Sequence, residues 1–124
     1  MVEKVCIDSD YLISILHNKE YHKSVLQSLD AEIYTTSINI FELEYGKKEG
    51  EDIVELISKF NIVDFDKESA QISGRILLSL KKEGQIVDYK DIFIGAICIK
   101  NDLRLLTENK KHFERLKKFG LQLV

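Results

Sequence analysis

Short strand-like runs alternate with helix-like segments along this chain, and that alternation most constrains its fold. The expected strands cover residues 4–7, 33–35, 61–65, 103–107 and 121–124. The expected helices cover residues 11–16, 20–29, 53–60, 67–82, 89–99 and 110–118, and a further helix that carries Glu42 is expected after the cap Ser37. This order predicts right-handed βαβ units, and hence an α/β fold whose mostly parallel sheet of about four to five strands is flanked by helices.

Apolar spacing predicts which helix faces are buried. In the helix 20–29, Tyr21, Val25 and Leu29 recur at four-residue steps. The helix 67–82 is predicted to begin after the cap Asp66 and to end at Gly84. The residues expected to face inward from it are Ala70, Ile72, Ile76, Leu77 and Leu80.

Length and composition indicate one domain, residues 1–124, with a core of ordinary size. No apolar run approaches the roughly 18 residues that span a bilayer, and the start of the sequence does not resemble a signal peptide. A cytoplasmic location is therefore expected, without a membrane partner. Cys6 and Cys98 lie in apolar runs and are expected to be buried thiols rather than a disulfide or zinc ligands.

The net charge of −3 hides an asymmetry along the chain. Residues 1–62 carry 12 acids and 6 bases, whereas residues 63–124 carry 9 acids and 12 bases. A basic C-terminal part is consistent with nucleic-acid binding, and equally with a solvated helix face. The overall acidity disfavours a protein that coats nucleic acid non-specifically.

Three acids stand in apolar surroundings at places that the fold can bring together. Asp8 follows the first strand, Glu42 lies between Phe41 and Leu43, and Asp91 opens an apolar helix. Sites of parallel α/β sheets lie outside the carboxyl ends of the strands. Because buried carboxylates need a partner, we expect these acids to share a divalent cation. Asn109, after the strand 103–107, can join them.

Each of these residues also has an ordinary structural explanation. Asp8 can be a helix cap, Asp91 can be stabilised by a helix dipole, and Asn109 can be a turn residue. Of Glu42 and Glu44, one should face the site and the other solvent, and we expect Glu42 to face the site. Asp10 and the three histidines, which show no ligand spacing, are expected at the surface. No glycine-rich phosphate loop occurs, which disfavours ATP or dinucleotide use.

Four segments in order resemble the motifs of the PIN-domain family, and especially its toxin ribonucleases of the VapC type. The segments are Val5–Ile13, Ser37–Gly46, Asp91–Ala96 and Leu106–Glu114. The resemblance covers essentially the whole chain, and it implies a three-layer domain with a central parallel sheet between helices.

The resemblance also implies an activity. Family members bind Mg²⁺ or Mn²⁺ with acids and cleave RNA, so Asp8, Glu42 and Asp91 would be catalytic metal ligands. Asn109 and Ser9 would position water or substrate. Many members carry a further acid where this chain has Asn109 or His112, so a second metal ion is in doubt. A small antitoxin partner and a homodimer are implied as well.

Two other functions stay open at this stage. A non-catalytic RNA-binding module on the same fold is favoured by the fourth segment, where Asn109 and His112 are not acids. A phosphatase of the haloacid-dehalogenase type is suggested by Asp8-Ser9-Asp10 after a strand, with Asp8 as nucleophile.

Overall fold

Five parallel strands form the centre of the molecule in a computed structural model that describes residues 2–124. Met1, the first residue of the start examined for a signal peptide, lies outside the described residues. The strands are β1 (Glu3–Ile7), β2 (Ala31–Thr36), β3 (Asn61–Val63), β4 (Arg104–Leu106) and β5 (Gln122–Leu123). Their order is β3-β2-β1-β4-β5, and every neighbouring pair is parallel. The predicted α/β sheet is confirmed.

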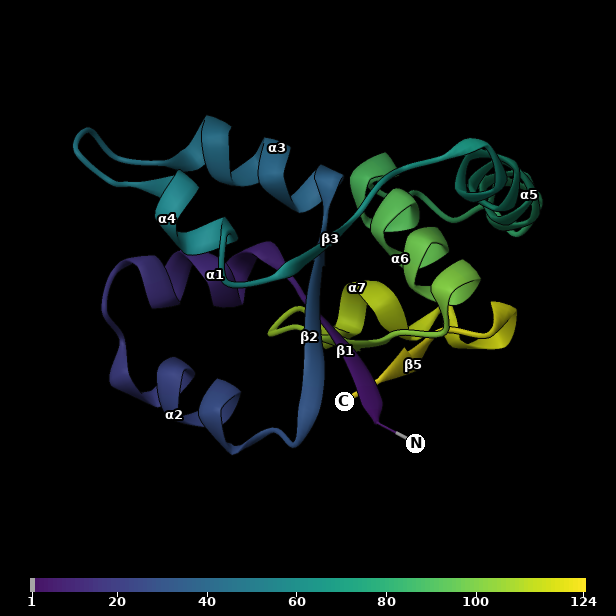
Figure 1. Ribbon diagram of the computed structural model, residues 1–124. Helices are drawn as coiled ribbons and strands as arrows, with labels where there is room; N and C mark the ends of the chain where they lie inside the picture. Colours follow the sequence, from purple (N-terminus) through teal and green to yellow (C-terminus); the bar gives the residue numbers. More distant parts are fainter. Residues whose placement is uncertain (1) are drawn as a thin grey trace.

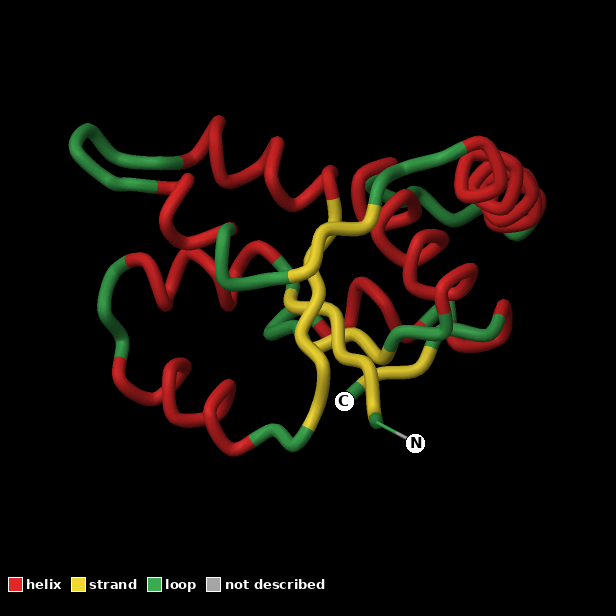
Figure 2. Tube along the Cα trace, in the orientation of Figure 1, coloured by secondary structure: helices red, strands yellow, loops and turns green. Residues whose placement is uncertain are grey.

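Helices cover both faces of this sheet (Figures 1 and 2). They are α1 (Ser9–Leu16), α2 (Glu20–Ser28), α3 (Ser37–Gly46), α4 (Ile53–Ile57), α5 (Lys67–Lys82), α6 (Tyr89–Asn101) and α7 (Lys110–Glu114), with a 3₁₀ turn, η1 (Lys117–Phe119). In Figure 1, α1 to α4 lie left of the sheet and α5 and α6 lie right. The carboxyl ends of the strands point toward α1, α3 and the start of α6.

The alternation of side chains along β1 divides the core into two halves. Val5 and Ile7 pack with Leu12 and Leu43 on one face, where α1, α3 and α4 lie. Cys6 points to the other face, into a cluster built mainly from α5, α6 and β4. Both cysteines are buried free thiols, as predicted. A side-chain hydrogen bond with Cys98 and burial raise the pKa of the Cys6 thiol.

Some residues predicted to be buried are exposed instead. Tyr21 is 70% exposed because α2 buries none of its residues fully and contacts the core only toward its C-terminal end, through Val25, Leu26 and the cap residue Leu29. Ala70 is exposed because α5 packs through the face of Ser69, Ser73, Ile76 and Leu80, and Ala70 lies about 100° around the helix from Ser69. The predictions for Tyr21 and Ala70 were therefore wrong, whereas Val25 and Leu29 do pack against the core.

Element ends differ from the sequence prediction where a polar group takes over the backbone. The strand predicted over 61–65 ends at Val63, since the Phe65 N–H donates to Ser37 Oγ at 3.0 Å instead of continuing beside β2. The helix predicted over 110–118 ends at Glu114 and continues as the turn η1, which Gly120 closes at φ 109°. No helix within residues 2–124 has the length and apolarity needed to cross a bilayer.

Candidate functional site

Asp8 is a buried carboxylate at the carboxyl end of β1, where it caps α1. Its backbone N–H donates to the Leu106 carbonyl at 3.0 Å, which fixes it beside the end of β4. Three groups donate to the carboxylate: the Ser9 N–H at 2.9 Å, Asn39 Nδ2 at 3.0 Å and Thr107 Oγ1 at 2.7 Å. The side chain is held in one orientation by donors from the start of α1, from α3 and from the end of β4.

These hydrogen bonds do not offset the cost of burying the charge of Asp8. The residue is only 6% exposed, and no lysine or arginine pairs with it among the salt bridges of residues 2–124. Burial, followed by repulsion from Asp10 and more weakly from Glu42, raises the pKa of Asp8 to about 7. A nearby cation would supply the stabilisation of the charged form that these hydrogen bonds leave incomplete.

Ser9 links Glu42 to Asp8, because it donates hydrogen bonds to both carboxylates. Its Oε1 accepts a hydrogen bond from Ser9 Oγ at 2.7 Å, and its Oε2 lies 3.8 Å from Lys90 Nζ. Glu44, two residues later, is exposed and pairs with Lys47 at 2.9 Å. The structure thus turns Glu42 toward the site and Glu44 away, as the sequence predicts. Of the two apolar neighbours of Glu42, Leu43 is buried, whereas Phe41 is 57% exposed.

Asp91 approaches the same region from the first turn of α6. Asp88 caps that helix by accepting the Lys90 N–H at 2.9 Å, and Asp91 is half-buried. Burial raises the pKa of Asp91, with smaller contributions from Asp88 and Glu42. His112 opposes the shift, with its Nδ1 3.5 Å from Asp91 Oδ2. Since Glu42 raises the pKa of both Asp8 and Asp91, the three acids share one electrostatic environment.

Asn109 does not join the acids through its side chain. It is exposed, stands before α7 without a side-chain capping bond, and donates only its backbone N–H to Thr107 Oγ1 at 3.0 Å. In the part of the chain that the structure describes, no three His, Cys, Asp or Glu side chains converge closely enough to enclose an ion. The three acids therefore line one open edge rather than a closed cage.

Two residues that hold Asp8 escaped the sequence analysis. Asn39 is fully buried, forms a capping box with Thr36, and donates Nδ2 to both Asp8 and Ser9 Oγ, the latter at 2.8 Å. Thr107 is 3% exposed at the end of β4. The only sequence signal was position, since Asn39 stands three residues before Glu42 and Thr107 stands two before Asn109.

Asp10 is also closer to the site than expected. It is half-buried, not solvent-facing, because its Oδ2 accepts the Glu108 N–H at 3.1 Å and its Oδ1 accepts the Tyr11 N–H at 2.7 Å. Burial raises the pKa of Asp10. Asp10 thereby ties the start of α1 to the loop after β4 and adds negative charge next to Asp8.

Fold and site together define a class of protein: a parallel α/β domain with oxygen donors at the carboxyl ends of its strands. The oxygens that can bind a cation are those of the carboxylates and of the Ser9 hydroxyl, because the Asn39 amide turns its nitrogen to Asp8 and its oxygen to Thr36. Neither cysteine lies among them. Carboxylates and hydroxyls are ligands of hard divalent cations such as Mg²⁺ and Mn²⁺. The composition of the donor set fits such an ion.

Comparison with known proteins identifies the family. The PIN domain family model matches residues 5–119. Ribonuclease VapC1 of Methanocaldococcus jannaschii is 33% identical over 97% of this chain and 86% of its own length, and Ribonuclease VapC3 of the same organism is 35% identical over 73% and 94%. The chain belongs to the PIN-domain family, in the group of the VapC ribonucleases.

Solved structures show the same fold. The structure of VapBC2 from Rickettsia felis bound to a promoter DNA fragment matches with a TM-score of 0.85 and 22% identity, over 97% of this chain and 96% of the other. VapBC from Salmonella typhimurium bound to DNA matches with a TM-score of 0.81 and 24% identity, over 98% and 97%. The predicted three-layer PIN-like fold is confirmed.

Proposed function

We propose that this chain is a metal-dependent endoribonuclease that hydrolyses RNA phosphodiester bonds and acts as the toxin of a toxin–antitoxin pair. Membership of the VapC ribonucleases supports the reaction. The observation that carries the metal dependence is Asp8, a buried carboxylate whose pKa burial raises to about 7 and which has two further acids at its edge. Such a group favours a bound cation.

Asp8, Glu42 and Asp91 would hold Mg²⁺ or Mn²⁺ at this edge. When bound, such an ion lowers the pKa of a coordinated water and stabilises charge on a phosphate. Thr107, Asn39 and the Ser9 N–H keep the Asp8 carboxylate oriented toward the site. Ser9 Oγ fixes Glu42, which can bind the ion or orient the attacking water. Lys90 limits the repulsion among the acids.

The fourth of the PIN-like segments, Leu106–Glu114, supports binding of one metal ion. Asn109 and His112 stand where many relatives carry an acid, and Asn109 faces solvent here. Asn109 could still position a water or the substrate at the mouth of the site. A second ion would have fewer carboxylates available, so single-ion occupancy is the expected state.

The proposed protein partner, oligomeric state and location rest on the same relatives. The solved structures named above are VapBC complexes, which supports a small antitoxin as the protein partner. A homodimer, a cytoplasmic location and a single functional domain over residues 1–124 belong to the same proposal.

The two alternatives stand differently. A phosphatase that uses Asp8 as a nucleophile is disfavoured because the matching family model is that of the PIN domain and the curated relatives are VapC ribonucleases. A non-catalytic RNA-binding protein is favoured by the open arrangement of the acids and by the neutral Asn109. Metal-dependent turnover separates it from the nuclease.

The first prediction concerns removal of the metal. Purified chain free of any antitoxin should cleave single-stranded RNA with Mn²⁺ or Mg²⁺, lose that activity in excess EDTA, and regain it when Mn²⁺ is restored, since no lysine or arginine of residues 2–124 pairs with the buried Asp8 carboxylate. Gel electrophoresis of the RNA measures the extent of cleavage under each metal condition. RNA binding without cleavage under every metal condition would favour the non-catalytic alternative, and full cleavage in EDTA would contradict the metal site.

A second prediction concerns Asn39 as a positioning residue. Asn39→Ala should lower Mn²⁺ affinity and cleavage about 10- to 100-fold, the usual effect of losing a hydrogen bond that orients a metal ligand. Thr36→Val is the matched control, because it breaks the same capping box and leaves the Asn39 donor on Asp8. Calorimetry with Mn²⁺ on both variants, folded by circular dichroism, separates the two roles. Equal affinities in the two variants would make Asn39 a helix cap only.

A further inference from the structure

A surface hollow adjoins the acidic edge from the side of α2 and α7. Its volume is about 550 Å³, within the usual size range of ligand sites. Its lining includes Tyr11, Tyr21, Thr107, Lys110, Lys111 and His112. Two of these residues also contact the acids: Thr107 donates to Asp8, and His112 lies 3.5 Å from Asp91. The hollow is therefore the space next to the proposed reaction centre.

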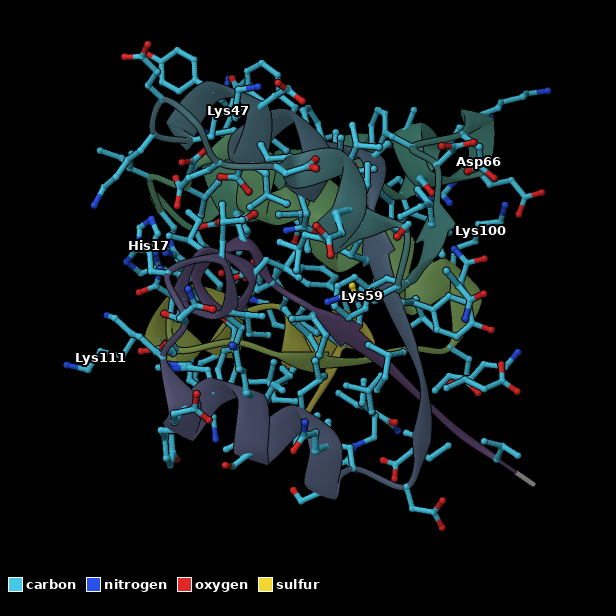
Figure 3. All side chains as sticks on the ribbon, turned by 60° about the vertical axis from the view of Figure 1, so that its left-hand side comes forward. His17, Lys47, Lys59, Asp66, Lys100 and Lys111 are labelled. Atoms are coloured by element: carbon cyan, nitrogen blue, oxygen red, sulfur yellow. The ribbon has the colours of Figure 1, made fainter. Side chains whose placement is uncertain are left out.

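The rim of this hollow carries uncompensated positive charge. Lys110 and Lys111 are exposed at the start of α7, and neither forms a salt bridge with any residue from 2 to 124. In Figure 3, Lys111 extends away from the ribbon into solvent. The one acid of the lining, Glu108, is bound by His22. Two free ammonium groups beside a phosphodiester site match the charge of an RNA backbone.

The hollow also offers an aromatic surface. Tyr21 is 70% exposed on a helix without buried residues, so the core does not account for it. His22 meets the edge of Tyr21, with ring centroids 5.3 Å apart and an interplanar angle of 88°. His22 likewise meets Tyr11 at 4.9 Å and is fixed by Glu108. The Tyr21 ring thus packs against His22, while most of Tyr21 stays exposed to solvent.

We propose that this hollow binds an unpaired nucleotide next to the scissile phosphate of the RNA. Its base stacks on Tyr21, and Lys110 and Lys111 hold the adjoining phosphates. Proteins bind single-stranded nucleic acid through this combination of an aromatic platform and a basic track. The inference rests on the proposed ribonuclease function, because that function makes RNA the occupant, and it adds where the strand lies and why it must be single-stranded.

The test measures RNA binding apart from cleavage. Fluorescence anisotropy of a short labelled single-stranded RNA of mixed sequence, in EDTA, gives the dissociation constant at several salt concentrations. Tyr21→Ala should weaken binding about tenfold with an unchanged salt slope, since stacking is not ionic, and Tyr21→Phe should restore it. Lys110→Ala/Lys111→Ala should weaken binding and reduce the slope of log K against log salt by about 1.4, or roughly 0.7 per lost phosphate contact.

Matched controls exclude general effects of surface change. Tyr45→Ala removes a tyrosine of α3 that is 86% exposed and lies outside the hollow. Lys81→Ala/Lys82→Ala removes two adjacent exposed lysines from the last turn of α5. Both controls should bind the RNA as the parent does. A duplex RNA of the same sequence should show no dependence on Tyr21.

The outcomes separate this inference from the proposed function. If the parent cleaves RNA while the Tyr21 and lysine variants bind and cleave like the parent, the subsite is wrong and the nuclease stands. If these variants lose RNA binding as predicted, but the parent cleaves RNA with neither Mn²⁺ nor Mg²⁺, the subsite stands and the nuclease is wrong. If Tyr21→Ala weakens capture of a co-expressed antitoxin and leaves RNA binding unchanged, the hollow is a protein-docking site, which overturns the inference.

Discussion

Asp8→Asn is expected to lower the rate of RNA cleavage roughly a thousandfold at a Mn²⁺ concentration that saturates the parent. The asparagine keeps the size of the side chain and its capping of α1 but removes the charge that would hold the ion. A metal ion stabilises the transition state by several kcal/mol, which corresponds to about three powers of ten in rate. Asparagine caps a helix as well as aspartate does. A large loss in this variant therefore reports on the carboxylate and not on the start of α1. Single-turnover cleavage of a labelled RNA measures it.

Asp52→Asn is the matched control for that experiment. Asp52 also caps a helix, accepting the Glu55 N–H at 3.1 Å before α4, but it is exposed and remote from the acids. Its replacement should leave the cleavage rate unchanged. If Asp8→Asn and Asp52→Asn both cut RNA at the parental rate, Asp8 is a cap alone and the proposed site is wrong.

The metal-free protein is expected to lose stability as the pH rises from about 4 to 7. Burial raises the pKa of Asp8 from 3.8 to about 7, so the folded state holds a proton that the unfolded chain has already released. In that interval the folded state binds more protons, and the free energy of unfolding falls with pH. The shift of about three units corresponds to about 4 kcal/mol lost by pH 8. Urea unfolding in EDTA across this range measures it.

Two comparisons identify the group responsible. Asp8→Asn should flatten the loss between pH 4 and 7 and make the metal-free protein more stable than the parent at pH 8, because the buried charge is gone. Mn²⁺ should restore the parent's stability at pH 8, since an ion that binds only the folded state stabilises it by mass action. An equally steep loss in Asp8→Asn would assign the pH dependence to other groups.

Periodicity and chain order were enough to predict the architecture. Short apolar runs separated by helical spacing predicted the parallel sheet, and the cap Asp66 was predicted correctly because capping is decided within one turn. Burial was predicted less well where a helix has few neighbours. Tyr21 shows the same spacing as Val25, but spacing gives only a common face and does not tell how much of that face the sheet covers.

The acids could be found in the sequence because each stands out against apolar neighbours, whereas their supports could not. Asn39 and Thr107 are neutral residues, and their importance lies in contacts across 31 and 99 positions of the chain. The sequence analysis expected Asp10 at the surface because its hydrogen-bond partner, the Glu108 N–H, lies 98 positions further along the chain. Long-range hydrogen bonds of this kind have no periodicity that a sequence could reveal.

The most direct measurement of the central claim is calorimetric titration of Mn²⁺ into metal-free protein, side by side for the parent and Asp8→Asn. If Asp8, Glu42 and Asp91 form a cation site, the parent should bind one ion with release of protons from the acids as the pH is lowered toward 7. Asp8→Asn should show no binding heat. Equal binding by both proteins, or no binding by the folded parent, would contradict the account.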